Sequence, residues 1–375
     1  MTVNCKYSTI TKAEGEAGVT LIELMISLTI SMVIILAVVT MLTDASRSHM
    51  EVNRSSQMIE NGRFAIQQIR TDLRLAGYYG HYFFGNIPTP ATLPDPCVTT
   101  PAATILSGMA LPVQGYNAGS LTQRPDLTAT TCTGSFLSDS NLNPGSDILL
   151  IRRANTGVFI GTPELNVPYL QSNVSTAEIQ FGVTTANVTG AVGSTTADTS
   201  VAATMMKVDG TTPADIREYT PRLYFIAPCS IGSGANGLCV AGDDGIPTLK
   251  MLELSGGTTT SITITPLAEG IEYMKLSYGV DNSPVTINST TGMIGDGVPD
   301  IYTQTPTLDQ WPLVVSVQVN MLARTPSPSG GVLDDKSYNL GGTAITASVL
   351  DDNYKRHVFS NEVSLTNMAG PREIP

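Results

Sequence analysis

Glu23 needs a chemical explanation, because it is the only charged side chain in the 24-residue run Val19–Leu42. A carboxylate inside a membrane segment costs roughly 2.5–3.5 kcal/mol on insertion scales, so such a group marks a functional site by default. It needs a cationic partner, and the run contains no Lys or Arg. Cleavage after Gly18 would create an amine on Val19, about one helical turn before Glu23. The pattern predicts an ion pair between Glu23 and this new N-terminus, in the same chain or in a neighbour.

The five cysteines are the second group with defined chemistry. Cys5 lies in the segment that cleavage after Gly18 removes, which leaves an even set of four for an exported protein. Unpaired thiols are the alternative to disulfides, and the sequence has no C-x-x-C pair to support a redox or zinc site. Disulfides suit an oxidising periplasm and would pin two loop-rich regions. Three pairings are open, and closeness in sequence favours one of them: Cys97–Cys132 with Cys229–Cys239.

Two aspartates around a glycine, in Asp296-Gly-Val-Pro-Asp300, form a candidate cation site, with Asp281 upstream on the same connection. Carboxylates together with backbone carbonyls supply the oxygen ligands that calcium takes. A full EF-type loop would need more acids and a bidentate Glu. An ordinary Asp-Gly turn explains these residues equally well, and the acidic pairs at 243–244 and 351–352 are alternatives. Calcium is therefore a candidate ligand, and no other cofactor is predicted.

Side chains suited to catalysis are sparse. The histidines are His49, His81 and His357, and their small number limits metal and acid–base chemistry. The sequence contains no G-x-S-x-G, G-x-x-x-x-G-K or H-E-x-x-H motif. His357 lies in a basic patch with Lys355 and Arg356, which is typical of a solvated strand entry. We therefore predict that the chain is not an enzyme.

The element that must position Glu23 is a helix of more than six turns. At about 1.5 Å per residue, the run 19–42 spans roughly 36 Å, which exceeds the ~30 Å of a bilayer core. The run is too long for a secretory leader, and small residues precede it instead of following it. The predicted order is a leader at 1–18, a membrane helix at 19–42 and an exported remainder.

Residues 43–78 are predicted to continue this helix as an amphipathic segment, since no Pro occurs between Val19 and Tyr82. Gly62 lies inside it and costs about 1 kcal/mol relative to Ala, which marks a local weak point. The helix is expected to end near Ala76-Gly77. Apolar residues recur with helical spacing at Val52, Ile59, Ile66, Ile69, Leu73 and Ala76. Five arginines, which form either a solvated face or a surface for acidic neighbours, fall mostly off this stripe: Arg47, Arg54, Arg63, Arg70 and Arg74.

Residues 79–375 are predicted to form a β-rich head, because the helical period is lost and short β-branched runs alternate with turn residues. The alternation in SVQVNM predicts a sheet with one wet face. Thr-, Gly- and Pro-rich stretches at 85–146 and 183–213 are expected to be surface loops or partner-facing insertions. The predicted strands are 147–152, 222–227, 249–254, 261–265, 271–278, 313–323 and 358–365.

The composition of the chain argues against two classes of protein. Of the 375 residues only 14% are charged, and the formal net charge is −12. Sparse charge argues against a helical protein held together by salt bridges. The acidic balance argues against nucleic acid as the main partner.

The heptapeptide from Gly18 to Leu24, GVTLIEL, resembles the class III leader of type IV pilins and pseudopilins. In that family a prepilin peptidase cuts after the Gly, the new N-terminus is methylated, and the acid at the fifth mature position docks the subunit into a filament. The resemblance implies cleavage between Gly18 and Val19, N-methylation of Val19 and docking by Glu23. Val stands where Phe or Met is commoner. Calcium-binding pseudopilins add support to the candidate at Asp296 and Asp300.

Further segments resemble the PilW family of minor pilins: ENGRFA, DLRLAGYYG, LAEGIEYMKLSYGVD and YKRHVFSNEVSLTN. The resemblance implies an α+β, pilin-like fold. In it, a long N-terminal helix, half in the membrane and half amphipathic, packs on an antiparallel β-sheet head with long loops. The protein would be a single-pass inner-membrane protein with its head in the periplasm, and later part of a pilus tip at the cell surface.

The resemblance also implies a role and partners. The role is to help prime assembly of a type IV pilus, in adhesion, twitching motility or DNA uptake. The partners would be the prepilin peptidase, other minor pilins, the major pilin, a tip adhesin and inner-membrane lipid, with no nucleic acid predicted directly.

Two alternatives stay open. A J-type pseudopilin of a type II secretion system shares the leader, the helix and the β-rich head. A surface-binding or adhesin module would use the pilin leader only for export. The ENGRFA segment favours the pilus, and the piliation of a deletion strain separates the adhesin module from it.

Overall fold

The computed structural model describes residues 18–83, 87–99, 102–132, 137, 139–160, 163–182, 205–234, 237–256, 261–283, 295–330, 333–346, 350 and 352–372. The chain divides into two compact units, Met1–Asn53 and Arg54–Pro375. The predicted leader, apart from Gly18, and most of the stretch 183–213 lie outside the described residues. Hydropathy predicts that the membrane segment ends at residue 42, whereas the two compact units meet at residues 53 and 54.

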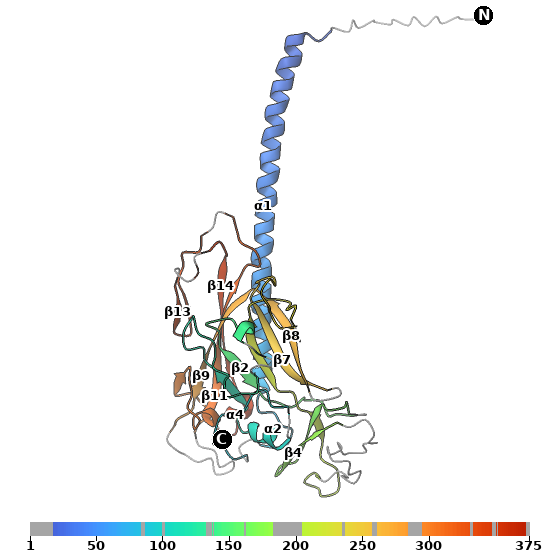
Figure 1. The fold of residues 1–375 in the computed structure, drawn as a ribbon, viewed down its shortest axis with the longest axis vertical. Helices are drawn as coiled ribbons and strands as arrows, with labels where there is room; N and C mark the ends of the chain where they lie inside the picture. Colours follow the sequence, from blue (N-terminus) through green and yellow to red (C-terminus); the bar gives the residue numbers. More distant parts are fainter. Residues whose placement is uncertain are drawn as a thin grey trace, which may run out of the picture. The chain divides into compact units, whose positions relative to one another are not determined.

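Helix α1 spans Leu21–Arg74 as one continuous helix of 54 residues (Figure 1). The predicted continuous helix is therefore present, and it ends at Arg74, close to the predicted end near Ala76-Gly77. Gly77 turns the chain away with a φ of +72°, a left-handed conformation that favours glycine. Its backbone N–H donates to the carbonyl of Arg152 at 3.0 Å, so the turn is tied directly to the head.

A five-stranded antiparallel sheet has the order β1-β2-β6-β7-β8. Its longest pairing joins β7 to β8 from Thr248 opposite Glu269 to Ser255 opposite Ser261. The strands are β1 (Val113–Tyr116), β2 (Ile148–Ile151), β6 (Arg222–Ala227), β7 (Thr248–Ser255) and β8 (Ser261–Glu269).

A four-stranded antiparallel sheet has the order β10-β9-β11-β14. The two C-terminal strands that the sequence predicts as long and antiparallel pair over nine positions, from Ser316 opposite Ser364 to Arg324 opposite Arg356. The strands are β9 (Ile271–Val280), β10 (Ile301–Thr303), β11 (Val314–Arg324) and β14 (Arg356–Ser364).

Smaller elements complete the head. A three-stranded sheet has the order β4-β3-β5, and β12 pairs with β13. These strands are β3 (Pro168–Ser172), β4 (Ala177–Phe181), β5 (Ile216–Glu218), β12 (Tyr338–Leu340) and β13 (Thr343–Ile345). The short helices are α2 (Ala102–Gly108), η2 (Asp139–Asn141), η4 (Trp311–Leu313) and α4 (Thr366–Ala369).

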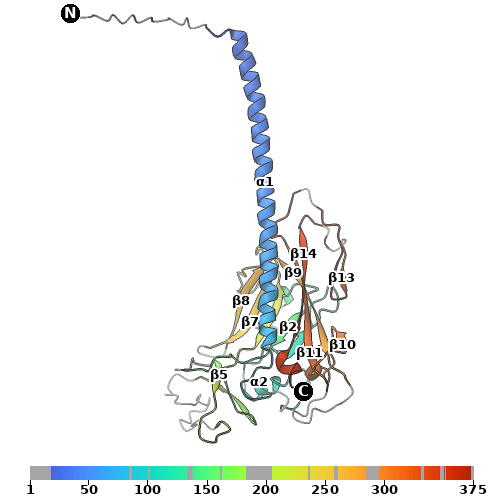
Figure 2. The same ribbon diagram turned by 180° about the vertical axis from the view of Figure 1, so that it is seen from behind.

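The part of α1 that belongs to the second unit packs across both large sheets. Figures 1 and 2 show it with β7 and β8 on one side and β11 and β14 on the other. Its side chains Ala65, Ile69 and Leu73 are fully buried in one apolar core with residues of both sheets. A buried ion pair between Asp147 and Lys275, 2.9 Å apart, links the chain before β2 to β9. The fold is thus α+β with antiparallel sheets, as predicted.

The buried face of α1 differs from the predicted stripe. Ile69, Leu73 and Ala76 are buried as expected, but Ile59 and Ile66 are only half-buried and Val52 is 62% exposed. The structure instead buries Met58, Gly62, Ala65, Ile69, Asp72 and Leu73. The spacing of apolar residues does not predict that Gly62 and Asp72 are buried. Glycine has no apolar side chain, and a single acid is expected on the solvent-exposed face of a helix.

The predicted wet face of β11 is present only in part. Of the three polar residues in the alternating run, Ser316 and Asn320 are buried and Gln318 is half-buried. Their partners on β14 are exposed: Ser364, Ser360 and Glu362. The Ser360 hydroxyl donates to Asn320 Oδ1 at 2.7 Å, and the Ser316 hydroxyl contacts Glu362 Oε1 at 3.3 Å. The face is covered in part because Gly341, beside β12, approaches Asn320 closely.

All seven predicted strands are present. The missed strands are the short ones, such as β1, β3 and β10, whose three to five residues leave little periodicity to detect.

Candidate functional site

The N-terminal end of α1 holds the predicted assembly residue in a capping box. The backbone N–H and the hydroxyl of Thr20 donate to Glu23 Oε2 at 2.9 and 2.8 Å, and Glu23 N–H donates back to Thr20 Oγ1 at 3.3 Å. This reciprocal pattern satisfies amide groups that a helix start leaves without partners. The Thr-x-x-Glu spacing could have revealed it in the sequence. The Glu23 carboxylate is therefore oriented towards Thr20, the residue directly after Val19.

Among the described residues, α1 is the one helix long and apolar enough to cross a membrane. The side chains of its apolar run are exposed in the isolated chain, from Leu21 to Leu42. An apolar N-terminal helix with one acid near its start fits a membrane-anchored protein. The structure places Gly18 and Val19 immediately before this helix.

Asp72 near the end of α1 is the first polar site that fixes the helix to the head, and it is 1% exposed. Arg153 Nη2 lies 3.0 Å from its Oδ1, and Arg222 Nη1 lies 2.9 Å from the same oxygen. The Tyr224 hydroxyl donates to Oδ2, and burial raises the pKa of this tyrosine, so it keeps its proton. One carboxylate on the helix is thus held by two cations and a hydroxyl of the head.

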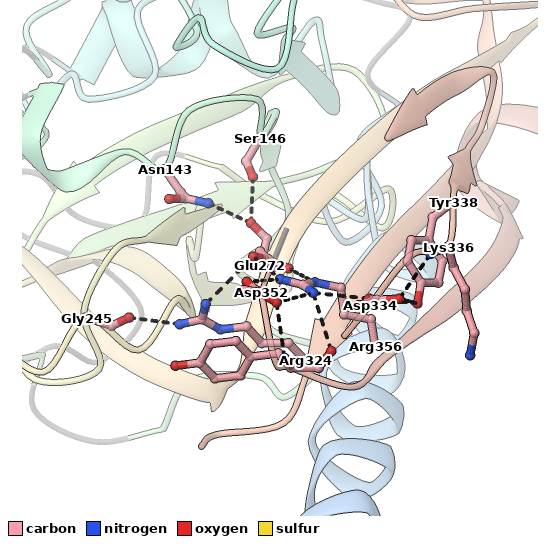
Figure 3. Close-up of polar contacts among 11 residues, drawn as sticks. Asn143, Ser146, Gly245, Glu272, Arg324, Asp334, Lys336, Tyr338, Asp352 and Arg356 are labelled. Carbon is pink, nitrogen blue, oxygen red and sulfur yellow. Dashed lines mark hydrogen bonds and ion pairs between the residues drawn. The ribbon is translucent and has the colours of Figure 1, made fainter. Parts of the chain in front are cut away.

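Arg356, the first residue of β14, is the second buried polar site (Figure 3). Its side chain is fully buried, and its guanidinium bonds Glu272 through Nε at 2.6 Å and Nη2 at 3.1 Å. It also contacts Asp334 at 3.1 Å and Asp352 at 2.7 Å. Arg324 adds a second cation, 3.8 Å from Glu272. Because Asp334 and Asp352 belong to the connection between β11 and β14, Arg356 ties two points of that connection to β9.

Both disulfides form between the cysteines that sequence proximity pairs, Cys97 with Cys132 and Cys229 with Cys239. All four side chains are buried in one apolar cluster with residues of the five-stranded sheet, such as Phe225 of β6. The Cys97–Cys132 bond therefore pins the predicted loop-rich stretch 85–146 to this cluster. The Cys229–Cys239 bond lies after the stretch 183–213 and pins the connection between β6 and β7 instead.

The buried Lys250 of β7 lies beside the second disulfide. Its Nζ is 3.7 Å from both Cys229 Sγ and Cys239 Sγ. Burial lowers the pKa of Lys250, and the nearby carboxylates Asp244 and Asp243 oppose this shift.

Asp296 and Asp300 use their carboxylates in turn hydrogen bonds. Asp296 Oδ1 accepts from Val298 N–H at 2.9 Å, and Asp300 Oδ2 accepts from Asn282 N–H at 2.7 Å. Asp281, fully buried, accepts from Gly297 N–H at 2.9 Å. This is the bonding of the Asp-Gly turn that the sequence offers as an alternative, so calcium at this loop stays a prediction.

One described group of three potential metal-ligand side chains brings its ligand atoms within 4.8 Å of one another: Cys229, Cys239 and Asp243. Its two sulfur atoms are joined in the disulfide, so no thiolate is present to bind a metal there.

The histidines occupy unrelated places. His357 on β14 packs edge-on against Phe359, with ring centroids 4.8 Å apart. His81 lines a hollow of 240 Å³ with Ser172 and Asp209, and His49 lies in the first unit. The structure therefore assigns no two of them to one site.

The polar residues that sequence reasoning missed are Thr20, Asp72 and Arg356. Thr20 had a recognisable spacing to its partner Glu23. Asp72 had none, since its partners lie between 81 and 152 residues away in sequence. Arg356 has one partner nearby, Asp352 four residues before it, but Asp334 and Glu272 lie 22 and 84 residues away.

A family model described as Type IV Pilus-assembly protein W (PilW) matches residues 230–367. A search of curated proteins finds no match. Among solved structures, a type IV-like pilin from Thermus thermophilus is similar at 16% sequence identity, with a TM-score of 0.18, over 40% of this chain and 78% of that one. The resemblance to the PilW family is thus confirmed over residues 230–367, the stretch that contains β7 through β14.

Proposed function

We propose that this chain is a minor pilin of the PilW kind that helps prime assembly of a type IV pilus and sits at its tip. The observation that carries the proposal is the PilW match over residues 230–367. The apolar N-terminal helix with its single acid, Glu23, supports the same role from the other end of the chain.

In this proposal a prepilin peptidase cuts between Gly18 and Val19, and the new amine is methylated. The helix from residue 19 to 42 holds the subunit in the inner membrane, with the head in the periplasm. Other minor pilins, the major pilin and a tip adhesin are the partners during assembly.

Glu23 sets the register of assembly. Its carboxylate already accepts two hydrogen bonds from Thr20, through one oxygen, Oε2. A carboxylate has room for further donors, so an N-terminal amine of the same chain or a neighbour can pair with it. In lipid, a misplaced subunit would leave that charge unpaired at a cost of several kcal/mol. Correctly placed subunits are favoured because the pairing removes this cost.

The test is a set of chromosomal variants, Glu23→Lys and Glu23→Gln, with a deletion strain. Glu60→Gln is the matched control, because Glu60 is an exposed acid elsewhere on α1. We expect fewer surface pili by electron microscopy and less twitching for the deletion and both Glu23 variants, with the control unchanged. Protease resistance of the head should stay as in the wild type.

Mass spectrometry of the mature protein is the second measurement, and we expect a chain that begins with methylated Val19. A protein that still begins at Met1, or full piliation of the Glu23→Lys strain, would refute the proposal. Loss of secreted enzymes with normal pili would instead identify a pseudopilin of a secretion system. Normal piliation together with lost surface binding would identify an adhesin module.

A further inference from the structure

The outward face of α1 carries two adjoining hollows within the second unit. The first, of about 520 Å³, lies between α1 and β14 and is lined by Arg63, Phe64, Ile66, Gln67, Phe359 and Ser360. The second, of about 590 Å³, includes Gln67, Arg70 and Arg74 in its lining. Gln67 borders both, so the hollows form one groove along the helix, named here the α1 groove.

The α1 groove is basic, and the described residues that line it include no acid. Arg63, Arg70 and Arg74 follow one another at spacings of seven and four residues, which places them on one side of the helix. All three are exposed, and none makes an ion pair with a described residue. In a chain with a formal net charge of −12, three neighbouring guanidinium groups without a carboxylate partner are an unusual local feature.

The end of the groove near β14 is apolar. The Phe64 side chain is 50% exposed although it is large and aromatic. Phe359 of β14 lies against Gly62 and forms the opposite wall. A partner side chain that entered here would remove apolar surface from water, at about 25 cal/mol per Å² of area.

The adjacent strand β14 is the last strand of its sheet, and among the strands that the structure describes it pairs with β11 only. An end strand has unpaired backbone groups along its outer edge, and an extended segment can bond to them. The groove therefore suits an extended segment better than a second helix.

We propose that the α1 groove binds an acidic, extended segment of a neighbouring subunit that carries an aromatic or aliphatic side chain. The carboxylates of the segment would pair with Arg70 and Arg74, since guanidinium groups bind carboxylates through two parallel hydrogen bonds. Its apolar side chain would enter between Phe64 and Phe359. That the partner is a subunit of the same assembly rests on the proposed function, whereas the charge and apolar preference rest on the groove alone.

The first experiment measures binding by the full chain in detergent micelles. Three fluorescent peptides serve as probes: Glu-Asp-Phe-Asp-Glu, its neutral counterpart Gln-Asn-Phe-Asn-Gln and the acidic peptide Glu-Asp-Gly-Asp-Glu. We expect the first to bind at least tenfold more tightly than either of the others by fluorescence anisotropy. We also expect its binding to weaken as salt rises, because exposed charge pairs are screened.

Variants locate the site on the protein. Arg70→Glu with Arg74→Glu should weaken binding of the acidic Phe peptide about tenfold or more, since each change replaces an attraction to the peptide's carboxylates by a repulsion. Lys336→Glu is the matched control, because Lys336 is exposed elsewhere on the head, and it should leave binding unchanged. Phe64→Ser should reduce the preference for Phe over Gly.

Three results would overturn the proposal: equal binding of the Phe and Gly peptides, equal weakening by Lys336→Glu, or stronger binding to phosphatidylglycerol vesicles or a DNA duplex than to the acidic Phe peptide.

The second experiment separates this proposal from the proposed function. In cells, the Arg70 and Arg74 double variant should reduce pili several-fold while Lys336→Glu does not. If peptide binding is lost but piliation stays normal, a neighbouring subunit is excluded as the occupant. If the deletion strain itself has normal pili, the proposed function fails, and the peptide experiment still decides what the groove binds.

Discussion

The ring of Phe359 occupies the space that a side chain at position 62 would need. An ideal Cβ on Gly62 would lie 2.2 Å from Phe359 Cε2, well inside the distance that real Cβ atoms show. The glycine that looks like a weak point in the helix is thus a position where a side chain of β14 packs directly on the α1 backbone. Glycine at position 62 lowers the intrinsic stability of the helix, but it lets the Phe359 ring of the four-stranded sheet pack against the helix.

Gly62→Ala is expected to destabilise the head, although alanine favours helices. Helix propensity alone would add about 1 kcal/mol of stability. The added methyl group forces the Phe359 ring out of its place, and overpacking of this kind typically costs about 1–3 kcal/mol. We expect a net loss of about 1 kcal/mol in the free energy of unfolding, measured by urea denaturation of the full chain in detergent.

Phe359→Leu is the control for this first prediction. In that background Gly62→Ala should become neutral or stabilising, because the ring atoms that it meets are absent. A double-mutant cycle that gives no coupling between positions 62 and 359 would contradict the packing argument.

Asp72→Asn is expected to cost about 3–5 kcal/mol, because it leaves Arg153 and Arg222 near the core without their shared carboxylate. The change should appear as a lower unfolding midpoint of the head. Asp309→Asn, a matched change at an exposed acid, should leave the midpoint where it is. If the two variants unfolded alike, the buried pairing would not be a determinant of stability.

Removal of the disulfide that closes the longer loop is expected to destabilise the head more than removal of the other one. Cys97 and Cys132 are 35 residues apart, and Cys229 and Cys239 are 10 apart. Loop entropy gives about 4 kcal/mol for the longer loop and about 3 kcal/mol for the shorter one. Paired Cys→Ala variants, compared by thermal unfolding, should show this order, and the reverse order would refute the entropic explanation.

The Arg356 cluster is expected to make stability depend on acid pH. Burial would raise the pKa of Asp352, but hydrogen bonds and charge from Arg356 outweigh it and lower the pKa below its ordinary value. A lowered carboxyl pKa contributes stability above the unfolded value of about 3.9, and that contribution is lost as pH falls through the folded value.

The measurement is the difference in unfolding free energy between wild type and Asp352→Asn as a function of pH. It should be largest above about pH 4 and shrink as the pH falls below that value. A difference that grew in acid would contradict the assignment. Arg356→Met should destabilise at all pH values above this window, because Glu272 and Asp334 would then be buried without their main cation.

The sequence by itself determined the features that depend on neighbouring residues. The apolar run 19–42, the absence of Pro up to Tyr82 and the spacing of Thr20 and Glu23 are local, so helix α1 and the chemistry of its start follow from them. Strands rich in apolar residues, such as β6, β9 and β11, were likewise predicted because each carries its own pattern. Closeness in sequence sufficed for both disulfides.

Tertiary structure decided whatever depends on residues that are far apart in the chain. Position 62 must be a glycine only because the ring of Phe359, nearly 300 residues later, takes the space of a side chain there. Asp72 can be buried because Arg153 and Arg222 lie beside it. Asn320, on the polar face of β11, is buried in part because Gly341 approaches it closely. The α1 groove exists for the same reason, since its second wall comes from β14. Such contacts are set by packing and by the cost of unpaired buried charge, which no local pattern encodes.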